Sequence, residues 1–454
     1  MDFPPWFLWI TLGLSFLWLW EKLIWPLFSH FARSRGRRLV ERMNQRLALR
    51  LVPFKLAKKR SLEQGLIHDP EVLRTAETFR QEEGLSWREV EKLLARYARE
   101  IVPTFNVYLY YKWGYLAAKA LVQAFYKVRV GFLDKRAFSA VKPEDSVVFL
   151  MNHRSNFDYL LLAYIVRRHA SIAYAVGEWA RVWPLDALIR RLGGFFVRRN
   201  NPDKLYRKVL ERFVQLAAAG GVTQGVFPEG RLTRDGALGA PKLGLLHYLL
   251  KWFDPAGEHD LVFIPVGLNY DRVLEDRAHV EQGMGSRRLR RSLRFVFRLL
   301  RARLVGRKHL FGYASVLFGR PVSAKALVSP FGDVRRLPEA EYRNAITTLG
   351  QSLMERIAEA VPATPVSVLA LAWERAFSRG EVVSVHHVEE LVHPLSEKGN
   401  LVPHLSPGEL FHSAVRTLME RRAMVSQGST FRPTPEQEAL LRFYANSIRH
   451  LLRG

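Results

Sequence analysis

The sequence of 454 residues contains no cysteine. This absence excludes disulfide bonds, thiolate metal sites and a cysteine nucleophile, and it is compatible with a reducing compartment. Acidic residues are scarce: 43 Asp and Glu stand against 69 Lys and Arg, which gives a formal net charge of +26. So large a positive charge suits an anionic partner, and the two natural candidates are nucleic acid and an anionic membrane surface.

Several motifs are also missing. There is no zinc-finger spacing and no RRM-type aromatic motif, so nucleic acid is the weaker explanation for the charge. There is no Gly-x-Ser-x-Gly motif of a serine nucleophile. His386, His387 and His393 resemble a metal cluster, but no carboxylate spacing completes it. We interpret these three as solvated or helix-face histidines and expect no metal site.

The longest apolar stretch, residues 3–20, reads FPPWFLWITLGLSFLWLW and carries no charge. As a helix it would be roughly 27 Å long, close to the hydrocarbon core of a bilayer at about 30 Å. Tryptophans at both ends suit interfacial anchors, and the start Met1-Asp2 lacks the positive charge of a signal peptide. We predict a membrane span. The first alternative is a hydrophobic helix over 3–29 that lies in one leaflet, because Glu21 and Lys22 interrupt that longer segment, and the second is a soluble segment.

Basic residues follow this stretch and recur later. Seven arginines come after it: Arg33, Arg35, Arg37, Arg38, Arg42, Arg46 and Arg50. By the positive-inside rule we expect the protein at the cytoplasmic face of the cell inner membrane. Residues 286–308, SRRLRRSLRFVFRLLRARLVGRK, have the pattern of a cationic amphipathic helix lying on anionic lipid. An arginine-rich face packed on its own domain would show the same pattern.

Between residues 143 and 271, short apolar runs alternate with longer helical patterns. The runs are 146–151, 172–176, 194–197, 222–227 and 261–268. The helical patterns between them are 158–169, 181–192, 202–219 and 241–253. This alternation predicts an α/β fold with a central, largely parallel sheet flanked by helices. In such folds reactive residues gather in the loops at strand ends.

The rest of the chain completes a division into four parts. We predict a membrane anchor helix at 1–30, a basic helical region at 31–104, the α/β domain at 105–320 and a C-terminal helical domain at 321–454. Residues 105–130 have an aromatic, amphipathic helix pattern. Thr364-Pro365 and Ser406-Pro407 each predict a helix start, since a capping residue precedes a proline at the first helical position.

His153 and Asp158 stand in the stretch MNHRSNFDYLLL, at the seam between two apolar runs. Histidine is a good general base because its ordinary pKa is about 6.5, and a carboxylate on its other nitrogen fixes its tautomer. The plain alternative is a structural histidine beside a helix-capping aspartate. In the absence of a serine or cysteine nucleophile motif, such a base would activate a hydroxyl of the substrate itself.

Two further stretches place cations at strand ends. LGGFFVRRN (192–200) puts Arg198 and Arg199 after an apolar run, and arginine pairs bind phosphate bidentately. VFPEGRLTRDG (226–236) puts Glu229 and Gly230 after another apolar run. There a carboxylate and a hydroxyl can hold a polyol, while arginine and backbone N–H groups hold its phosphate. Taken singly, a basic surface turn and an Asp-Gly turn explain the same residues.

Taken together, these blocks resemble the glycerolipid acyltransferases, and within them the membrane-bound glycerol-3-phosphate 1-O-acyltransferase branch. Four blocks match in order and spacing: NHRSNFDYLLL, LGGFFVRR, FPEGRLTRDG and FIPVGLNYD. The resemblance is strong over 143–275. It extends more weakly to PATPVSVLALAW (362–373) and LLRFYANSIRHLL (440–452), which resemble the C-terminal region of that branch. It implies that 105–320 is the acyltransferase catalytic domain.

The resemblance also implies roles for individual residues. His153 would deprotonate the glycerol hydroxyl and Asp158 would orient His153, so that the alkoxide attacks an acyl thioester without an acyl-enzyme. Substrate-binding positions would be Asn152, Arg198, Arg199, Glu229, Gly230, Arg231, Thr233 and Arg234. Pro265 would help to shape the acyl-donor side. The implied product is lysophosphatidate, made from glycerol 3-phosphate in the first step of phospholipid synthesis.

One departure concerns the third block, which in relatives usually reads E-G-x-R-S. Here Leu232 stands at the arginine position, Arg231 lies one residue earlier and Thr233 takes the serine place. Either Arg231 serves from a shifted position, or Arg234 does, or the phosphate is held mainly by the second block. Acylation of lysophosphatidate or of dihydroxyacetone phosphate is therefore an alternative.

The expected partners are a phospholipid membrane, glycerol 3-phosphate and an acyl-CoA or acyl carrier protein thioester, with no nucleic acid. No metal or prosthetic group is required. A basic surface suits an acidic carrier protein as well as anionic lipid. The alternative from another class is a membrane-surface scaffold with a degenerate acyltransferase fold, and the intact His153 and Asp158 argue against it.

Overall fold

The computed structural model describes most of the chain after residue 58. The described ranges are 59–103, 115–142, 144–166, 173–177, 189–190, 193–198, 203–276, 310–427, 430–434 and 437–452. The predicted membrane anchor at 1–30 and the predicted amphipathic helix at 286–308 lie outside these ranges. Among the helices within them, none is both long and apolar enough to cross a bilayer.

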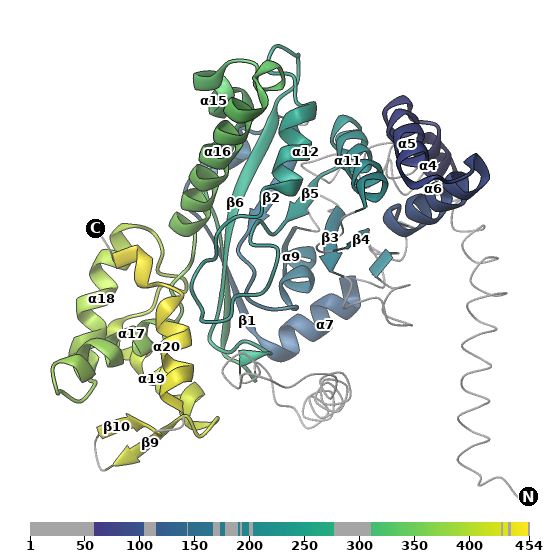
Figure 1. Ribbon diagram of the computed structural model, residues 1–454. Coiled ribbons are helices and arrows are strands. Elements are labelled where there is room, and N and C mark those ends of the chain that lie inside the picture. Colours follow the sequence, from purple (N-terminus) through teal and green to yellow (C-terminus); the bar gives the residue numbers. More distant parts are fainter. Residues whose placement is uncertain are drawn as a thin grey trace, which may run out of the picture.

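A mostly parallel sheet of eight strands forms the centre of the molecule (Figure 1). Its order is β1-β7-β6-β2-β5-β3-β4, and β8 pairs with β6. The strands are β1 Lys127–Phe132, β2 Ser146–Met151, β3 Ala173–Gly177, β4 Gly194–Val197, β5 Gln224–Val226, β6 Leu261–Tyr270, β7 Tyr313–Phe318 and β8 Val322–Ser323. Only β7 and β8 run antiparallel to β6; the other pairs are parallel. The predicted α/β fold with a largely parallel sheet is confirmed.

Helices cover both faces of this sheet. The α-helices before β5 are α4 Lys59–Ile67, α5 Pro70–Glu83, α6 Trp87–Ile101, α7 Tyr115–Phe125, α8 Lys135–Ser139, α9 Asp158–Val166 and α11 Lys204–Ala219. Those after β5 are α12 Gly244–Trp252, α15 Ala324–Val328, α16 Glu339–Glu359, α17 Pro365–Ser378, α18 Val385–Glu397, α19 Pro407–Met419 and α20 Glu438–Asn446. Short 3₁₀ turns occupy Ser329–Phe331, Val334–Arg336 and Arg449–Leu452.

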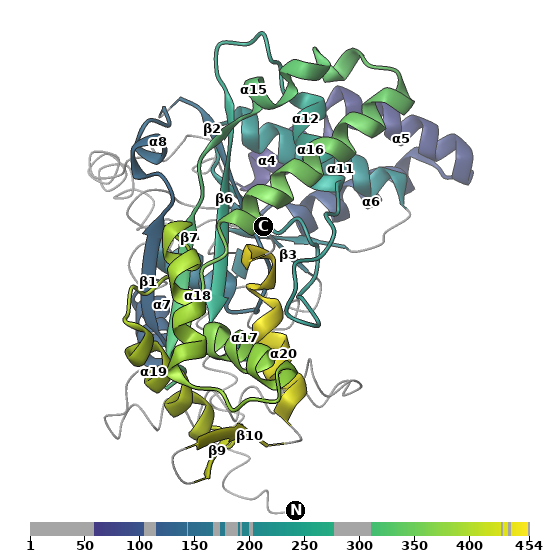
Figure 2. The same ribbon diagram turned by 90° about the vertical axis from the view of Figure 1, so that its left-hand side faces the viewer.

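Successive side chains of β2 point to opposite faces of the sheet and pack into two separate hydrophobic cores. Val147, Phe149 and Met151 face α7, α9 and α17, whereas Val148 and Leu150 face α11, α12 and α16. All six residues of β2 are buried, as expected of a strand in a parallel sheet that is covered on both faces. The C-terminal helices α17–α20 and the N-terminal helices α4–α6 lie at opposite ends of the molecule (Figures 1 and 2).

Three strands of the sheet, β1, β7 and β8, were not predicted from the sequence. Residues 127–130, predicted as the end of an aromatic helix, begin β1, because the helix ends at Phe125. Strand β7, which was not predicted, fills the gap between β1 and β6. Its six buried residues are too few to separate a strand from a helix by periodicity alone.

The C-terminal part is mainly helical, as expected, and two of its helices begin where the sequence predicts. Thr364 precedes α17 and Ser406 caps α19, each with proline at the first helical position. A hairpin of β9 Met424–Gln427 and β10 Thr430–Pro433 interrupts the helices. Because α16 packs on β6 and β2, part of the segment after residue 320 belongs to the covering of the sheet.

Candidate active site

The site is built at the carboxyl end of β2, where Asn152 turns the chain out of the sheet. The Asn152 amide accepts a hydrogen bond from the Leu268 backbone N–H at 2.7 Å and donates one to the Leu268 carbonyl at 2.9 Å. It thereby replaces a strand residue in the pairing with β6. Both ends of this side chain are engaged with the protein itself, and a role in substrate binding stays a prediction.

The structure brings His153 and Asp158 together. His153 Nδ1 lies 3.0 Å from Asp158 Oδ2, and the two side chains are 2% and 0% exposed. The imidazole lies against Phe227, with ring centroids 4.1 Å apart, and edge-on to Tyr159. A carboxylate at Nδ1 makes this nitrogen the N–H donor and leaves Nε2 as the nitrogen that can accept a proton.

Asp158 is held by groups that sequence reasoning did not identify. Its Oδ2 also accepts hydrogen bonds from the backbone N–H groups of Arg154 at 2.8 Å and Ser155 at 3.0 Å. Its Oδ1 accepts one from the Tyr270 hydroxyl at 2.6 Å. Tyr270 lies in the fourth block, at the last position of β6. Its place at a strand end is the sequence feature that could have marked it as a site residue. The first and fourth blocks therefore meet at one carboxylate.

Glu229 of the third block supports the histidine from the other side. Its Oε1 accepts a hydrogen bond from the His153 backbone N–H at 2.9 Å, and its Oε2 accepts one from Gly239 at 2.8 Å. Burial raises the pKa of the Glu229 carboxyl, although these two hydrogen bonds oppose the shift. Both carboxylate oxygens thus have backbone partners, which is a structural use of a residue predicted to hold a polyol.

The rest of the third block forms a loop beside His153. The Thr233 backbone N–H donates to the His153 carbonyl at 3.0 Å, and the Thr233 hydroxyl donates to Ala237 within the loop. Gly230 has φ of +65°, a left-handed conformation that favours glycine. Arg231 and Arg234 are exposed on the same loop. Because β5 is the neighbour of β2, this loop adjoins the first block directly.

Arg198 lies farther away and has a different partner. Its guanidinium donates to both carboxylate oxygens of Glu100 on α6, at 2.8 and 2.7 Å, and lies over the rings of Tyr97 and Tyr206. The hydrogen bonds to Glu100 raise the pKa of the guanidinium further. Three strand spacings, about 14 Å, separate β4 from β2. Arg199 lies outside the described residues.

Pro265 occupies the middle of β6 rather than a loop. It is buried and aligned with Leu150 of β2, and its carbonyl accepts a hydrogen bond from Gly319 at 2.8 Å. Its predicted role on the acyl-donor side stays a prediction.

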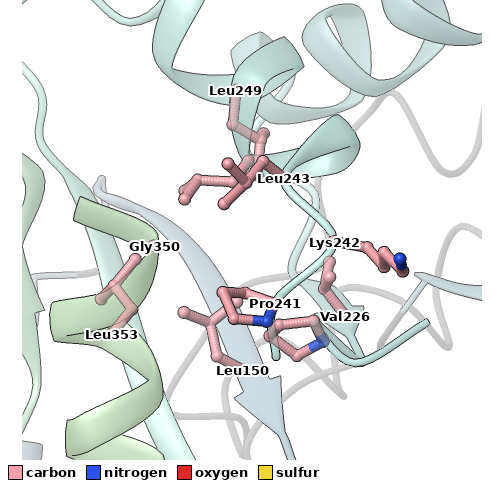
Figure 3. A pocket seen from close by; sticks show the side chains of 10 residues that line it. Leu150, Val226, Pro241, Lys242, Leu243, Leu249, Gly350 and Leu353 are labelled. Carbon is pink, nitrogen blue, oxygen red and sulfur yellow. The ribbon is translucent and has the colours of Figure 1, made fainter. Parts of the chain in front are cut away.

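A small apolar pocket lies on the sheet face that carries α12 and α16 (Figure 3). Its lining includes Leu150, Val226, Pro241, Leu243, Leu249 and Leu353. Lys242 stands at its edge with the amine directed away from these side chains (Figure 3). These apolar side chains offer no hydrogen-bond partner for a phosphate group, so we do not assign the phosphate to this pocket.

The three clustered histidines of the sequence lie on or at the start of α18. His387 bonds to Ser384 and Glu381, whereas His386 and His393 are exposed and pair with Glu390 and Glu397. Within the described part of the chain, no group of three or more metal-ligating side chains is arranged to hold an ion.

Comparison with known proteins identifies two regions. Residues 134–269 match the acyltransferase family model, and residues 296–453 match the glycerol-3-phosphate acyltransferase C-terminal region. Glycerol-3-phosphate acyltransferases match as curated relatives. The one from Pseudomonas putida is 27% identical over 335 residues, or 70% of this chain, and the one from Xylella fastidiosa is 24% identical over 394 residues, or 83%.

The relatives are longer proteins, since the matched parts make up 39% and 44% of their lengths. Among solved structures, the 1-acyl-sn-glycerophosphate acyltransferase PlsC from Thermotoga maritima matches with a TM-score of 0.32 and 18% identity, covering 65% of this chain and 92% of that one. The chain therefore carries an acyltransferase domain followed by a glycerol-3-phosphate acyltransferase C-terminal region.

Proposed function

We propose that the protein transfers a fatty acyl group from a thioester to a hydroxyl of glycerol 3-phosphate, which gives lysophosphatidate. The buried contact between His153 and Asp158 at the end of β2 carries this proposal. The relatives named glycerol-3-phosphate acyltransferase support the choice of acceptor.

In this reaction His153 Nε2 takes the proton of the glycerol hydroxyl while Asp158 holds Nδ1–H and stabilises the imidazolium. The oxygen attacks the thioester carbonyl carbon, the carbon–sulfur bond breaks, and the leaving thiolate takes the proton from His153. The donor is an acyl-CoA or an acyl carrier protein thioester. The step needs no metal or prosthetic group, because the base and the activated thioester supply the chemistry.

For the phosphate, the geometry favours the third block over Arg198. The side chain of Arg198 is committed to Glu100, whereas Arg231 and Arg234 lie exposed on the loop that adjoins His153. We therefore assign the phosphate to this loop, which replaces the arginine missing at Leu232.

The proposed place of action is the cytoplasmic face of the cell inner membrane, where the apolar stretch at 3–20 would anchor the protein. The uncharged stretch at 3–20, the arginines after it and the net charge of +26 support this.

The test is acyl transfer by the detergent-purified full chain with palmitoyl-CoA. Glycerol 3-phosphate, lysophosphatidate and dihydroxyacetone phosphate are offered in parallel, and each is repeated with His153→Ala. We expect lysophosphatidate from glycerol 3-phosphate, and a loss of about 100-fold or more in kcat in the variant. If product forms only with another acceptor, that acceptor is the substrate and the proposed mechanism still holds. No product with CoA or acyl carrier protein thioesters would overturn the proposal and favour a scaffold.

A further inference from the structure

The two oxygens of the Asp158 carboxylate have different surroundings. Oδ2 accepts three hydrogen bonds, from His153 Nδ1 and from the backbone N–H groups of Arg154 and Ser155. Oδ1 accepts the hydrogen bond of the Tyr270 hydroxyl at 2.6 Å. The backbone donors come from the loop just before Asp158, whereas Tyr270 comes from β6, 112 residues later. The Tyr270 bond is therefore the one that ties the carboxylate to the rigid sheet.

Packing alone does not require a hydroxyl at this position. The Tyr270 ring is fully buried and lies against the Tyr126 ring, with centroids 5.2 Å apart. A phenylalanine would fill the same space and leave Asp158 Oδ1 without this donor. Burial raises the pKa of Tyr270 well above its ordinary value, so the hydroxyl keeps its proton and acts as the donor.

We propose that Tyr270 is a positioning residue of the catalytic dyad: its hydroxyl fixes Oδ1 of Asp158 so that Oδ2 faces Nδ1 of His153. Its catalytic consequence rests on the proposed acyl transfer. Rotation of the carboxylate away from the imidazole would break the Tyr270 hydrogen bond, so this bond favours the 3.0 Å contact between His153 Nδ1 and Asp158 Oδ2.

The same hydrogen bond also sets how strongly Asp158 attracts a proton on His153. A donor to a carboxylate spreads its negative charge, so removing the donor changes the strength of the hydrogen bond between His153 Nδ1 and Asp158 Oδ2. Other ionisable groups around the dyad remain in place in such a variant: Arg154, Glu229, Glu275 and Tyr126.

The experiment compares Tyr270→Phe with Tyr126→Phe in the full chain. Tyr126 is a matched control, since its buried hydroxyl donates to the Arg272 carbonyl at 2.7 Å and not to Asp158. We expect Tyr270→Phe to lower kcat about tenfold with little change in either KM. Tyr126→Phe should keep kcat within about threefold.

A second readout does not depend on the substrate. The Nδ1–H group of His153 is observed by NMR with ¹⁵N-labelled histidine, the signal being assigned by its absence in His153→Gln. A shifted Nδ1–H resonance in Tyr270→Phe, with the wild-type resonance kept in Tyr126→Phe, supports the positioning role even if glycerol 3-phosphate proves to be the wrong acceptor. Equal kcat values and equal Nδ1–H resonances in the two tyrosine variants would overturn it.

Discussion

The Glu229 carboxylate lies between the first and third sequence blocks and accepts a hydrogen bond from the His153 backbone N–H at 2.9 Å. Its second oxygen is used by Gly239 of its own loop. Both oxygens thus hold the backbone of the two blocks, so this side chain positions the His153 backbone, and its predicted role in substrate binding stays a prediction.

Replacing Glu229 by glutamine should therefore act on kcat. The amide nitrogen faces one of two N–H donors, so one hydrogen bond is lost and the His153 backbone shifts. We expect kcat to fall about tenfold, with KM for glycerol 3-phosphate changed less than about twofold. Steady-state kinetics measures both, and the exposed Glu339→Gln on α16 is the control. A large rise in KM with kcat intact would show instead that Glu229 binds the polyol.

The pair of Arg198 and Glu100 gives a test of what the second block does. Glu100 is 4% exposed at its side chain, so Arg198→Met leaves a nearly buried carboxylate without this partner. We expect a loss of about 2–4 kcal/mol in unfolding free energy, most of which returns in the double variant Arg198→Met, Glu100→Gln.

Kinetics of that double variant separates the two roles of Arg198. If the arginine is structural, the double variant should recover both its stability and its KM for glycerol 3-phosphate. A KM that remains raised tenfold in a restored fold would assign Arg198 to the phosphate.

Gly236 lies where the third-block loop packs closely against the backbone of the C-terminal helix α20. Its φ is +90°, and a Cβ there would lie 1.8 Å from the Phe443 carbonyl oxygen. Gly236→Ala should lower the unfolding free energy by about 2 kcal/mol or more and reduce activity, because the loop and α20 must separate. Gly244→Ala at the start of α12, where a Cβ meets nothing within 4 Å, should be neutral in thermal unfolding. Equal melting temperatures for both variants would contradict the contact.

Asp271 predicts a pH-dependent stability. It is fully buried and accepts hydrogen bonds from the Val366 and Tyr313 backbones, and burial raises its pKa to about 6. The folded state then binds a proton more tightly than the unfolded state, so this group's contribution to stability is largest at pH 4 and is lost as the pH rises through 6. The full change is about 3 kcal/mol.

The matched variant for this effect is Asp271→Asn, which cannot ionise. Its destabilisation relative to the wild type should be greatest near pH 4 and shrink towards pH 7, as measured by denaturant unfolding at each pH. A difference that is constant across this range would show that Asp271 does not titrate there.

The strands between residues 146 and 270 and the contact of His153 with Asp158 were predictable because they depend on local pattern. The buried run Ser146–Met151 is a strand as expected, and a histidine five residues before an aspartate at a strand-to-helix turn comes into contact with it. Strand β7 was not predictable, since its partner β1 is 186 residues away from it in the chain at the pairing of Lys127 with Tyr313. Local periodicity carries no information on such a pairing.

The fold class, the four blocks and the resemblance to acyltransferases could be predicted without coordinates, because hydrophobic alternation and motif spacing are properties of the linear chain. The partner of each polar side chain became known only from the folded molecule. Arg198 was predicted to bind phosphate, but its guanidinium donates hydrogen bonds to Glu100. Tyr270 was predicted only as part of the fourth block, but its hydroxyl donates a hydrogen bond to Asp158. Such pairings join segments about 100 residues apart, and they form because a buried polar group must find a partner where the fold places one.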